Sequence, residues 1–161
     1  MEKATENGTK HCCTKINPAD WDGKEISWKG KVFVKGRVRS FFHFPLNFNA
    51  VVQKSEKAIK DAGVKMQEEL MLSDESSFWH SDLFIAVDRE AEGLNTCKLS
   101  GQYLTKVFEG PYHNAGLWVK EMQMYVRGKN KELKKIYFWY TTCPKCAKDY
   151  GKNHVVLFAE V

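Results

Sequence analysis

Two stretches of the chain carry residues at the three- and four-residue spacing of an amphipathic helix. In the first, which follows Pro45, the stripe consists of Phe48, Val51, Val52, Ser55, Ile59 and Ala62. In the second, which follows Pro111, it consists of Ala115, Trp118, Val119, Met122, Tyr125 and Val126. Proline suits the first helical turn, and the glycines that follow the stripes, Gly63 and Gly128, are typical helix stops. The pattern therefore predicts two amphipathic helices.

Each predicted helix is preceded by an extended apolar stretch and followed by two segments with strand character. The expected strands span residues 66–72 and 82–88 after the first helix, and residues 133–141 and 154–161 after the second. The preceding stretches, 38–47 and 104–113, superpose at an offset of 66 residues, which brings Phe42 onto Phe108. Because a repeat constrains architecture more tightly than local propensity does, we expect an α+β fold made of a duplicated strand–helix–strand–strand module.

The repeat also indicates how the chain is divided. The expected segments are an N-terminal tail at residues 1–30, repeat one at about 31–90 and repeat two at about 97–161. Within the tail, residues 25–28 are expected to begin a hairpin with residues 31–34, turning at Lys29-Gly30. Because a helix and three strands bury one face each, two such modules would pair or face each other across a cleft within one domain at 31–161.

Composition limits the classes of function. The chain has 161 residues, of which 43% are hydrophobic, and this is enough for one well-filled core. Its longest apolar run, residues 155–159, is far shorter than the roughly 20 residues that span a bilayer, and the polar N-terminus lacks the apolar centre of a secretory signal. The net charge of +5 comes from dispersed lysines without a recognisable nucleic-acid-binding motif. We therefore expect a cytoplasmic protein that binds neither membranes nor nucleic acid, of unknown oligomeric state.

The second repeat contains Val107-Phe108-Glu109-Gly110-Pro111-Tyr112, then the predicted helix, then Tyr137-Phe138-Trp139-Tyr140 and Pro144. This arrangement resembles the GyrI-like, or gyrase-inhibitor-like, small-molecule-binding family. The resemblance implies pseudo-twofold symmetry between the modules and a ligand cleft at their seam. It also implies binding of amphipathic or cationic aromatic compounds. A related group of hydrolases is similar along most of the chain, including Cys143-Pro144-Lys145-Cys146-Ala147.

Aromatic residues make up 13% of the chain, and aromatic walls suit planar or cationic ligands. The candidates for ligand contact are Phe42, Trp79, Tyr112, Trp118, Phe138, Trp139 and Tyr140. Side chains alternate along a strand, so Phe138 and Tyr140 share one face while Tyr137 and Trp139 share the other. The resemblance implies that Tyr140 faces the cleft. Trp118 lies on the apolar helix stripe, so it fits a core position as well as a ligand wall.

Some GyrI-like proteins hydrolyse cyclopropane-bearing compounds with a Glu and a Tyr two residues apart, on the strand before a proline turn. Aligning that turn here puts the Tyr at Tyr140 and the Glu at Phe138, so the carboxylate is missing. A tyrosine can still donate a proton to a developing oxyanion. The acids that could assist water are Asp82, Glu109 and Glu160. The candidate catalytic residues are therefore Tyr140, Glu109 and Asp82.

Five cysteines form an odd set that does not fit a disulfide framework in a cytoplasmic protein. Cys143 and Cys146 have the CxxC spacing that holds zinc when further Cys or His residues complete a tetrahedral site. The candidates for completing it are His11, Cys12, Cys13 and His154. The pair is therefore a candidate metal site, with inert turn thiols and a redox pair as alternatives.

Three hypotheses of function follow. The first is a free-standing protein that needs no cofactor, binds amphipathic or aromatic small molecules and so sequesters toxins. The second is a hydrolase that acts on a hydrophobic electrophilic small molecule in the same cleft, with Tyr140 as proton donor. It would not use a serine nucleophile of the GxSxG type, because that motif is absent. The third is a small interaction module stabilised by zinc.

Overall fold

The computed structural model describes residues 13–42 and 44–161 and contains both helices and strands. The chain folds into two compact units, of which the first is Ser27–Gly101 and the second is Gln102–Val161 together with the segment up to Ile26. Residues 1–12 of the expected N-terminal tail lie outside the described residues. The division into a tail and two repeats stays a prediction.

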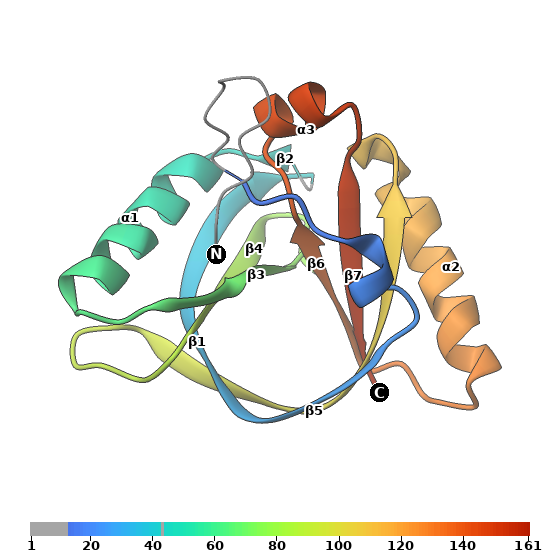
Figure 1. Cartoon of the computed structure of the whole chain (residues 1–161), viewed down its shortest axis with the longest axis horizontal. Helices are drawn as coiled ribbons and strands as arrows, with labels where there is room; N and C mark the ends of the chain where they lie inside the picture. Colours follow the sequence, from blue (N-terminus) through green and yellow to red (C-terminus); the bar gives the residue numbers. More distant parts are fainter. Residues whose placement is uncertain (1–12, 43) are drawn as a thin grey trace. The chain divides into compact units, whose positions relative to one another are not determined.

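The first unit combines antiparallel strands with one helix (Figure 1). Its elements are β1 Glu25–Phe41, β2 Phe44–Pro45, α1 Phe48–Asp61, β3 Met66–Asp74 and β4 His80–Val87. β1 pairs with β2 and with β4, and β4 also pairs with β3. The strands predicted at 66–72 and 82–88 are confirmed, with ends shifted by up to two residues.

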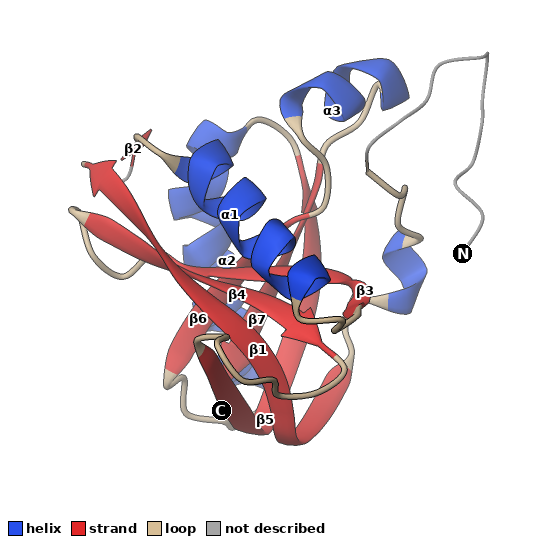
Figure 2. Ribbon diagram, turned by 90° about the vertical axis from the view of Figure 1, so that its left-hand side faces the viewer, coloured by secondary structure: helices blue, strands red, loops and turns tan. Residues whose placement is uncertain are grey.

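Helix α1 lies across the strands of the first unit (Figure 2) and packs on them with its predicted stripe. Ile59 of α1 belongs to a buried cluster whose other members are Val34, Val38, Val64, Leu83, Ile85 and Val87. Phe48, Val51 and Val52 are partly buried against this cluster. Gly36 on β1 permits the close approach, because a Cβ there would lie only 2.9 Å from Cγ1 of Val51. The chain leaves the helix through Gly63, whose φ of 69° is readily adopted only by glycine.

The second unit has the predicted helix between the first and second of three strands, and an additional helix that was not predicted. Its elements are the 3₁₀ turn η1 Pro18–Asp20, β5 Thr96–Glu109, the 3₁₀ turn η2 Tyr112–Asn114, α2 Ala115–Gly128, β6 Lys135–Tyr140, α3 Pro144–Tyr150 and β7 His154–Glu160. β5 belongs to this unit from Gln102 onward. β7 lies between β5 and β6 and is antiparallel to both, and α2 runs beside β5 and β7 (Figure 1).

Strand β6 buries side chains on both of its faces, in the alternation that was predicted. On one face lies a cluster of Leu104, Phe108, Trp118, Met122, Val126, Phe138, Val155, Leu157 and Ala159, against which Tyr140 is partly buried. On the other face Trp139 meets Trp21 edge to face, with ring centroids 4.9 Å apart. On the same face, the ring centroid of Tyr137 lies 6.4 Å from that of Tyr103. The second predicted helix stripe therefore forms a core, as expected of an amphipathic helix.

The predicted hairpin around Lys29-Gly30 is wrong, because β1 continues without reversal from Glu25 to Phe41. A tight hairpin turn needs a positive φ at its first central residue. Gly30 has a positive φ of 66°, whereas Lys29 is not among the described residues with a positive φ. The Gly30 N–H instead donates to Oγ of Ser100 at 2.7 Å, on β5. Gly30 therefore changes the local path of an extended strand.

The mixed helix and strand content agrees with the predicted class. The order strand, helix, strand, strand occurs twice, with α3 inserted before the last strand. Helix α3 was not predicted. The duplication, the pseudo-twofold symmetry and the ligand cleft between the modules stay predictions. None of the described helices combines the length and the apolar character that crossing a bilayer requires.

Candidate functional site

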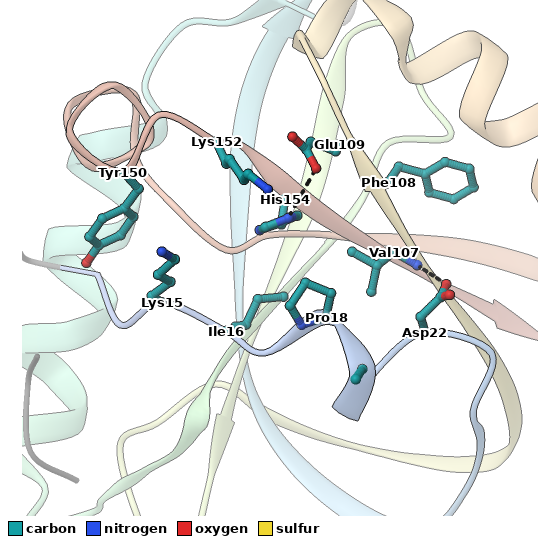
Figure 3. Close-up of a pocket in the computed structure, with 11 residues that line it drawn as sticks. Lys15, Ile16, Pro18, Asp22, Val107, Phe108, Glu109, Tyr150, Lys152 and His154 are labelled. Atoms are coloured by element: carbon teal, nitrogen blue, oxygen red, sulfur yellow. Dashed lines mark hydrogen bonds and ion pairs between the residues drawn. The ribbon is translucent and has the colours of Figure 1, made fainter.

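A pocket of about 490 Å³ lies within the second unit (Figure 3). Its walls come from three parts of the chain: residues 15–22, the end of β5, and the segment from the end of α3 to the start of β7. The lining is mixed. Ile16, Pro18 and Val107 supply apolar surface, whereas two carboxylates, two lysines and an imidazole supply charged and polar groups.

The central feature of this pocket is the pair formed by Glu109 and His154. Glu109 ends β5, His154 begins β7, and the two residues are direct partners in the antiparallel register. Nε2 of His154 lies 3.6 Å from Oε2 of Glu109. The imidazole is largely buried, with 12% of its side chain exposed, while the carboxylate is 54% exposed. A largely buried imidazole thus lies beside a carboxylate that solvent and small molecules can reach.

One backbone hydrogen bond and two side-chain hydrogen bonds at the strand ends hold this pair in place. The Gly110 N–H donates to the carbonyl of Asn153 at 3.3 Å, and Nδ2 of Asn153 donates to the carbonyl of Gly110 at 2.7 Å. Oγ1 of Thr141 donates to the carbonyl of His154 at 2.7 Å. Because both neighbours of the pair are fixed, Glu109 and His154 project from a rigid pair of strands.

The opposite wall, residues 15–22, is attached along β5. The side chain of Asn17 caps the turn η1 by accepting from the Ala19 N–H at 3.2 Å. Oδ1 of Asp22 accepts from the Val107 N–H at 3.0 Å (Figure 3), and Oγ1 of Thr105 donates to the carbonyl of Trp21. This wall, although far from β5 in sequence, is therefore part of the folded unit.

The arrangement fits acid–base chemistry. A histidine can take a proton from water, and a carboxylate beside it orients the ring and stabilises the imidazolium that forms. Lys15 and Lys152 bring positive charge to the same pocket, where it would stabilise an oxyanion. The pocket therefore holds the groups that a hydrolytic reaction requires.

Among the predicted catalytic residues, Glu109 lies in the pocket and Tyr140 packs elsewhere. The Tyr140 ring is partly buried against the core cluster that includes Trp118, Met122 and Val126 of α2, called the α2 cluster from this point. Its centroid lies 5.4 Å from that of Tyr112, edge to face, and 5.9 Å from that of Phe138, on which it stacks. Its role as proton donor stays a prediction.

Asp82, the third predicted catalytic residue, lies on β4 of the first unit within a cluster of charges. Its carboxylate is 3.0 Å from Nε of Arg37 and 3.5 Å from Nζ of Lys35. Burial acts to raise the pKa of Asp82, but the hydrogen bond from Arg37 and the charges of Lys35 and Arg37 outweigh it and lower the pKa. Asp82 is therefore held ionised as a cross-strand partner of Arg37.

This ion cluster predicts a pH-dependent loss of stability. Because the folded pKa of Asp82 lies below its unfolded value, the carboxylate stabilises the fold at neutral pH, and this contribution is lost as the pH falls through the folded pKa. We expect Asp82→Asn to lower the free energy of unfolding at pH 7 by about 0.5–1 kcal/mol, since Arg37 and Lys35 are partly exposed. The difference from the wild type should vanish in acid. Urea denaturation at pH 7 and at pH 3 measures this difference in the free energy of unfolding. The control is Asp61→Asn, on the exposed side of α1. A difference that persists unchanged at pH 3 would contradict the prediction.

Five of the seven predicted ligand-binding aromatics fall into two groups. Trp118, Phe138 and Trp139 are 4–7% exposed and belong to the core. Phe42 and Trp79 are more than half exposed, and their centroids lie 5.5 Å apart in the first unit. Phe41 and Phe78 adjoin them, so four rings form an exposed aromatic cluster. Contact with a ligand stays a prediction for all of these residues.

Three thiols meet in the second unit. The sulfur atoms of Cys13, Cys143 and Cys146 all lie within 4.8 Å of one another. The predicted CxxC pair is thus joined by Cys13, one of the four residues considered for completing it. His11 and Cys12 lie outside the described residues. Soft thiolates are zinc ligands, so this group could hold a metal ion.

Tyr112 lies beside this thiol group. Its hydroxyl donates to the carbonyl of Thr142 at 3.0 Å. Burial raises the pKa of Tyr112, and the nearby Cys143 and Cys13 raise it further. Tyr112 therefore stays a neutral hydrogen-bond donor at physiological pH.

Sequence reasoning missed several features of the pocket, among them Lys15, Asp22, Lys152 and the pairing of His154 with Glu109. One signal was available for His154. Glu109 was placed at the end of one predicted strand and His154 at the start of another, and antiparallel pairing of these strands would bring the two residues together. Asp22 and the lysines carried no such signal.

Comparisons with known proteins agree with hydrolytic chemistry. A family model described as bacterial hydrolase matches residues 3–161 of the chain. Among solved structures, an uncharacterized conserved protein from Listeria innocua matches with a TM-score of 0.60 and 13% identity, covering 86% of this chain and 91% of that one. A hydrolase from Listeria innocua matches with a TM-score of 0.57 and 12% identity over the same shares of the two chains. At such low identity these likenesses show the fold alone. The search of curated proteins found no match.

Proposed function

Because the chain belongs to the bacterial hydrolase family, we propose that it is a hydrolase whose reaction takes place in the pocket of Glu109 and His154. This favours the second of the three hypotheses. The observation that carries the proposal is the Glu109–His154 pair, in which a carboxylate lies 3.6 Å from a buried imidazole.

In the proposed reaction, His154 takes a proton from a water molecule while the water oxygen attacks an electrophilic carbon of the substrate. Since Nε2 faces Glu109, Nδ1 is the ring nitrogen that accepts this proton. The carboxylate stabilises the imidazolium, and Lys152 or Lys15 stabilises the oxyanion. The imidazolium then gives its proton to the leaving group. The base is regenerated, and one water molecule has been added across the broken bond.

The pocket favours a small substrate with an apolar part. Its volume of about 490 Å³ falls in the usual range for small-molecule sites, roughly 300–1,000 Å³. Ile16, Pro18 and Val107 would contact the apolar part, and the lysines would face an oxygen-rich electrophilic group. This agrees with the hydrophobic electrophile expected from the sequence. Esters, lactones and epoxides are the simplest members of that class.

The test measures hydrolysis of a panel of small apolar esters, lactones and epoxides by the purified protein. We expect turnover of at least one class. Ala19→Trp should lower kcat/KM for that substrate roughly tenfold or more, because a small displacement of a bound substrate has a large effect on rate. Ala19 lines the pocket, and the control Ala50→Trp is on an exposed part of α1. No turnover by the wild type, or equal activity of the two variants, would contradict the proposal.

Binding of amphipathic or aromatic compounds remains a second candidate function. It is supported by the exposed aromatic cluster of Phe41, Phe42, Phe78 and Trp79 in the first unit, since exposed aromatic patches suit planar ligands. The resemblance of the second repeat to the GyrI-like family implies this function, and the sequestration of toxins would depend on it. A binding surface and a hydrolytic pocket could serve the same compounds.

A further inference from the structure

The three-thiol group brings together two distant parts of the sequence. Cys13 lies 130 residues before Cys143, and their sulfur atoms and that of Cys146 are all within 4.8 Å of one another. Cys146 is 1% exposed, and the other two cysteines are partly buried. Such a convergence of reactive side chains requires a reason beyond packing, because single thiols fill core space equally well.

We propose that Cys13, Cys143 and Cys146 bind one zinc ion that fastens residues 13–22 to α3. A tetrahedral zinc with zinc–sulfur bonds of about 2.3 Å holds its sulfur atoms about 3.8 Å apart. The three sulfur atoms, all within 4.8 Å, reach this spacing by movements of about 1 Å or less. Three thiolates supply three of the four ligands.

Backbone N–H groups donate to two of the three sulfur atoms. Cys143 is the N-cap of α3, and its Sγ accepts from the Cys146 N–H at 3.5 Å. Sγ of Cys13 accepts from the Cys143 N–H at 3.3 Å. Hydrogen bonds to a charged form stabilise that form. Pro144 at the start of the helix adds no competing N–H and sets the chain direction between the two CxxC cysteines.

A second layer of hydrogen bonds holds the cysteine backbones. The Tyr150 hydroxyl donates to the carbonyl of Cys13 at 2.5 Å. The Tyr112 hydroxyl donates to the carbonyl of Thr142, the residue before Cys143. Groups of this kind orient the ligands of a metal, and their loss usually weakens metal binding. Both tyrosines therefore act as positioning residues for the zinc site.

The zinc site has a consequence for the pocket. Cys13 precedes Lys15 and Ile16, and Tyr150 on α3 also lines the pocket. A metal that joins Cys13 to α3 would fix this wall against the rest of the second unit. The inference does not depend on the hydrolase proposal, because it requires only that metal be bound.

The test is the metal content of the purified full chain, prepared under reducing conditions and dialysed against zinc and then against a weak chelator. We expect about one zinc per chain in the wild type and in Cys97→Ser, and below about a tenth of that in Cys13→Ser, Cys143→Ser and Cys146→Ser. Cys97 is a matched control, since it is a partly buried cysteine of the first unit. X-ray absorption should find at least three sulfur ligands at about 2.3 Å.

A second measurement keeps the inference testable should the serine variants fail to fold. Cobalt added to the metal-free wild type should give the intense near-ultraviolet absorption of sulfur-to-cobalt charge transfer, and zinc should abolish it. A folded wild type that takes up neither metal would overturn the inference. So would fewer than three sulfur ligands, equal zinc loss in Cys97→Ser, or a Cys143–Cys146 disulfide under these conditions.

Discussion

Replacing His154 by alanine is expected to lower kcat/KM for hydrolysis by about 10²–10⁴-fold, the usual contribution of a positioned general base. The expectation rests on a largely buried imidazole, next to which Gly110 and Asn153 are joined by one backbone and one side-chain hydrogen bond. Far-ultraviolet circular dichroism should be unchanged, because His154 is the first residue of β7 and its backbone bonds remain. Steady-state rates on a substrate from the panel measure the effect.

The control is His113→Ala, since His113 is exposed in η2 and lies outside the pocket lining. It should keep the wild-type rate. Equal rates for His113→Ala and His154→Ala would remove His154 from the mechanism even if the protein were a hydrolase.

Glu109→Gln completes this experiment by testing whether the two residues act as a unit. A neutral amide cannot stabilise an imidazolium, so the variant should be slow, and the double variant should be little slower than His154→Ala. Glu121→Gln is a matched control, because Glu121 is 52% exposed and paired with Lys106, much as Glu109 is 54% exposed and paired with His154. Additive effects of the two substitutions would show that the carboxylate acts independently.

Trp118→Ala is expected to have the largest effect on stability, a loss of about 3–5 kcal/mol in the free energy of unfolding. Trp118 is 5% exposed in the α2 cluster, with its ring stacked on Phe108 at 5.8 Å. The melting temperature should fall by about 6–20 °C for a chain of this size. Chemical denaturation followed by circular dichroism gives the free energy directly.

The control for this prediction is Trp79→Ala in the first unit, where the indole is 60% exposed. It should cost less than about 1 kcal/mol. Were the two substitutions to cost the same, Trp118 would not be a core residue, and its predicted place in a ligand wall would regain support.

The helices could be predicted because their signals are local. The stripe that contains Val51, Val52 and Ile59 has a helical period and ends at Gly63, so local pattern and burial agree over α1. Helix α3 has only seven residues and no apolar stripe. Its Cys143-Pro144 start is an N-cap signal, but the segment after it could equally be a turn.

The site was harder to predict because tertiary contacts define it. The pairing of Glu109 with His154 depends on the register of β5 and β7, which a single sequence does not specify. The approach of Cys13 to Cys143 depends on the path of residues 13–24 along β5. Tyr140 was placed in a cleft by a resemblance, whereas its packing on the α2 cluster depends on which face of β6 that helix covers.

The wall formed by residues 15–22 also determines when the pocket can appear during synthesis. These residues leave the ribosome well before their neighbours in the pocket, which include Tyr150, Lys152 and His154. Closing so long a loop costs entropy that only the finished contacts repay. A nascent chain that has not yet released the start of β7 therefore lacks one wall of the pocket, so the pocket forms only after His154 has been synthesised.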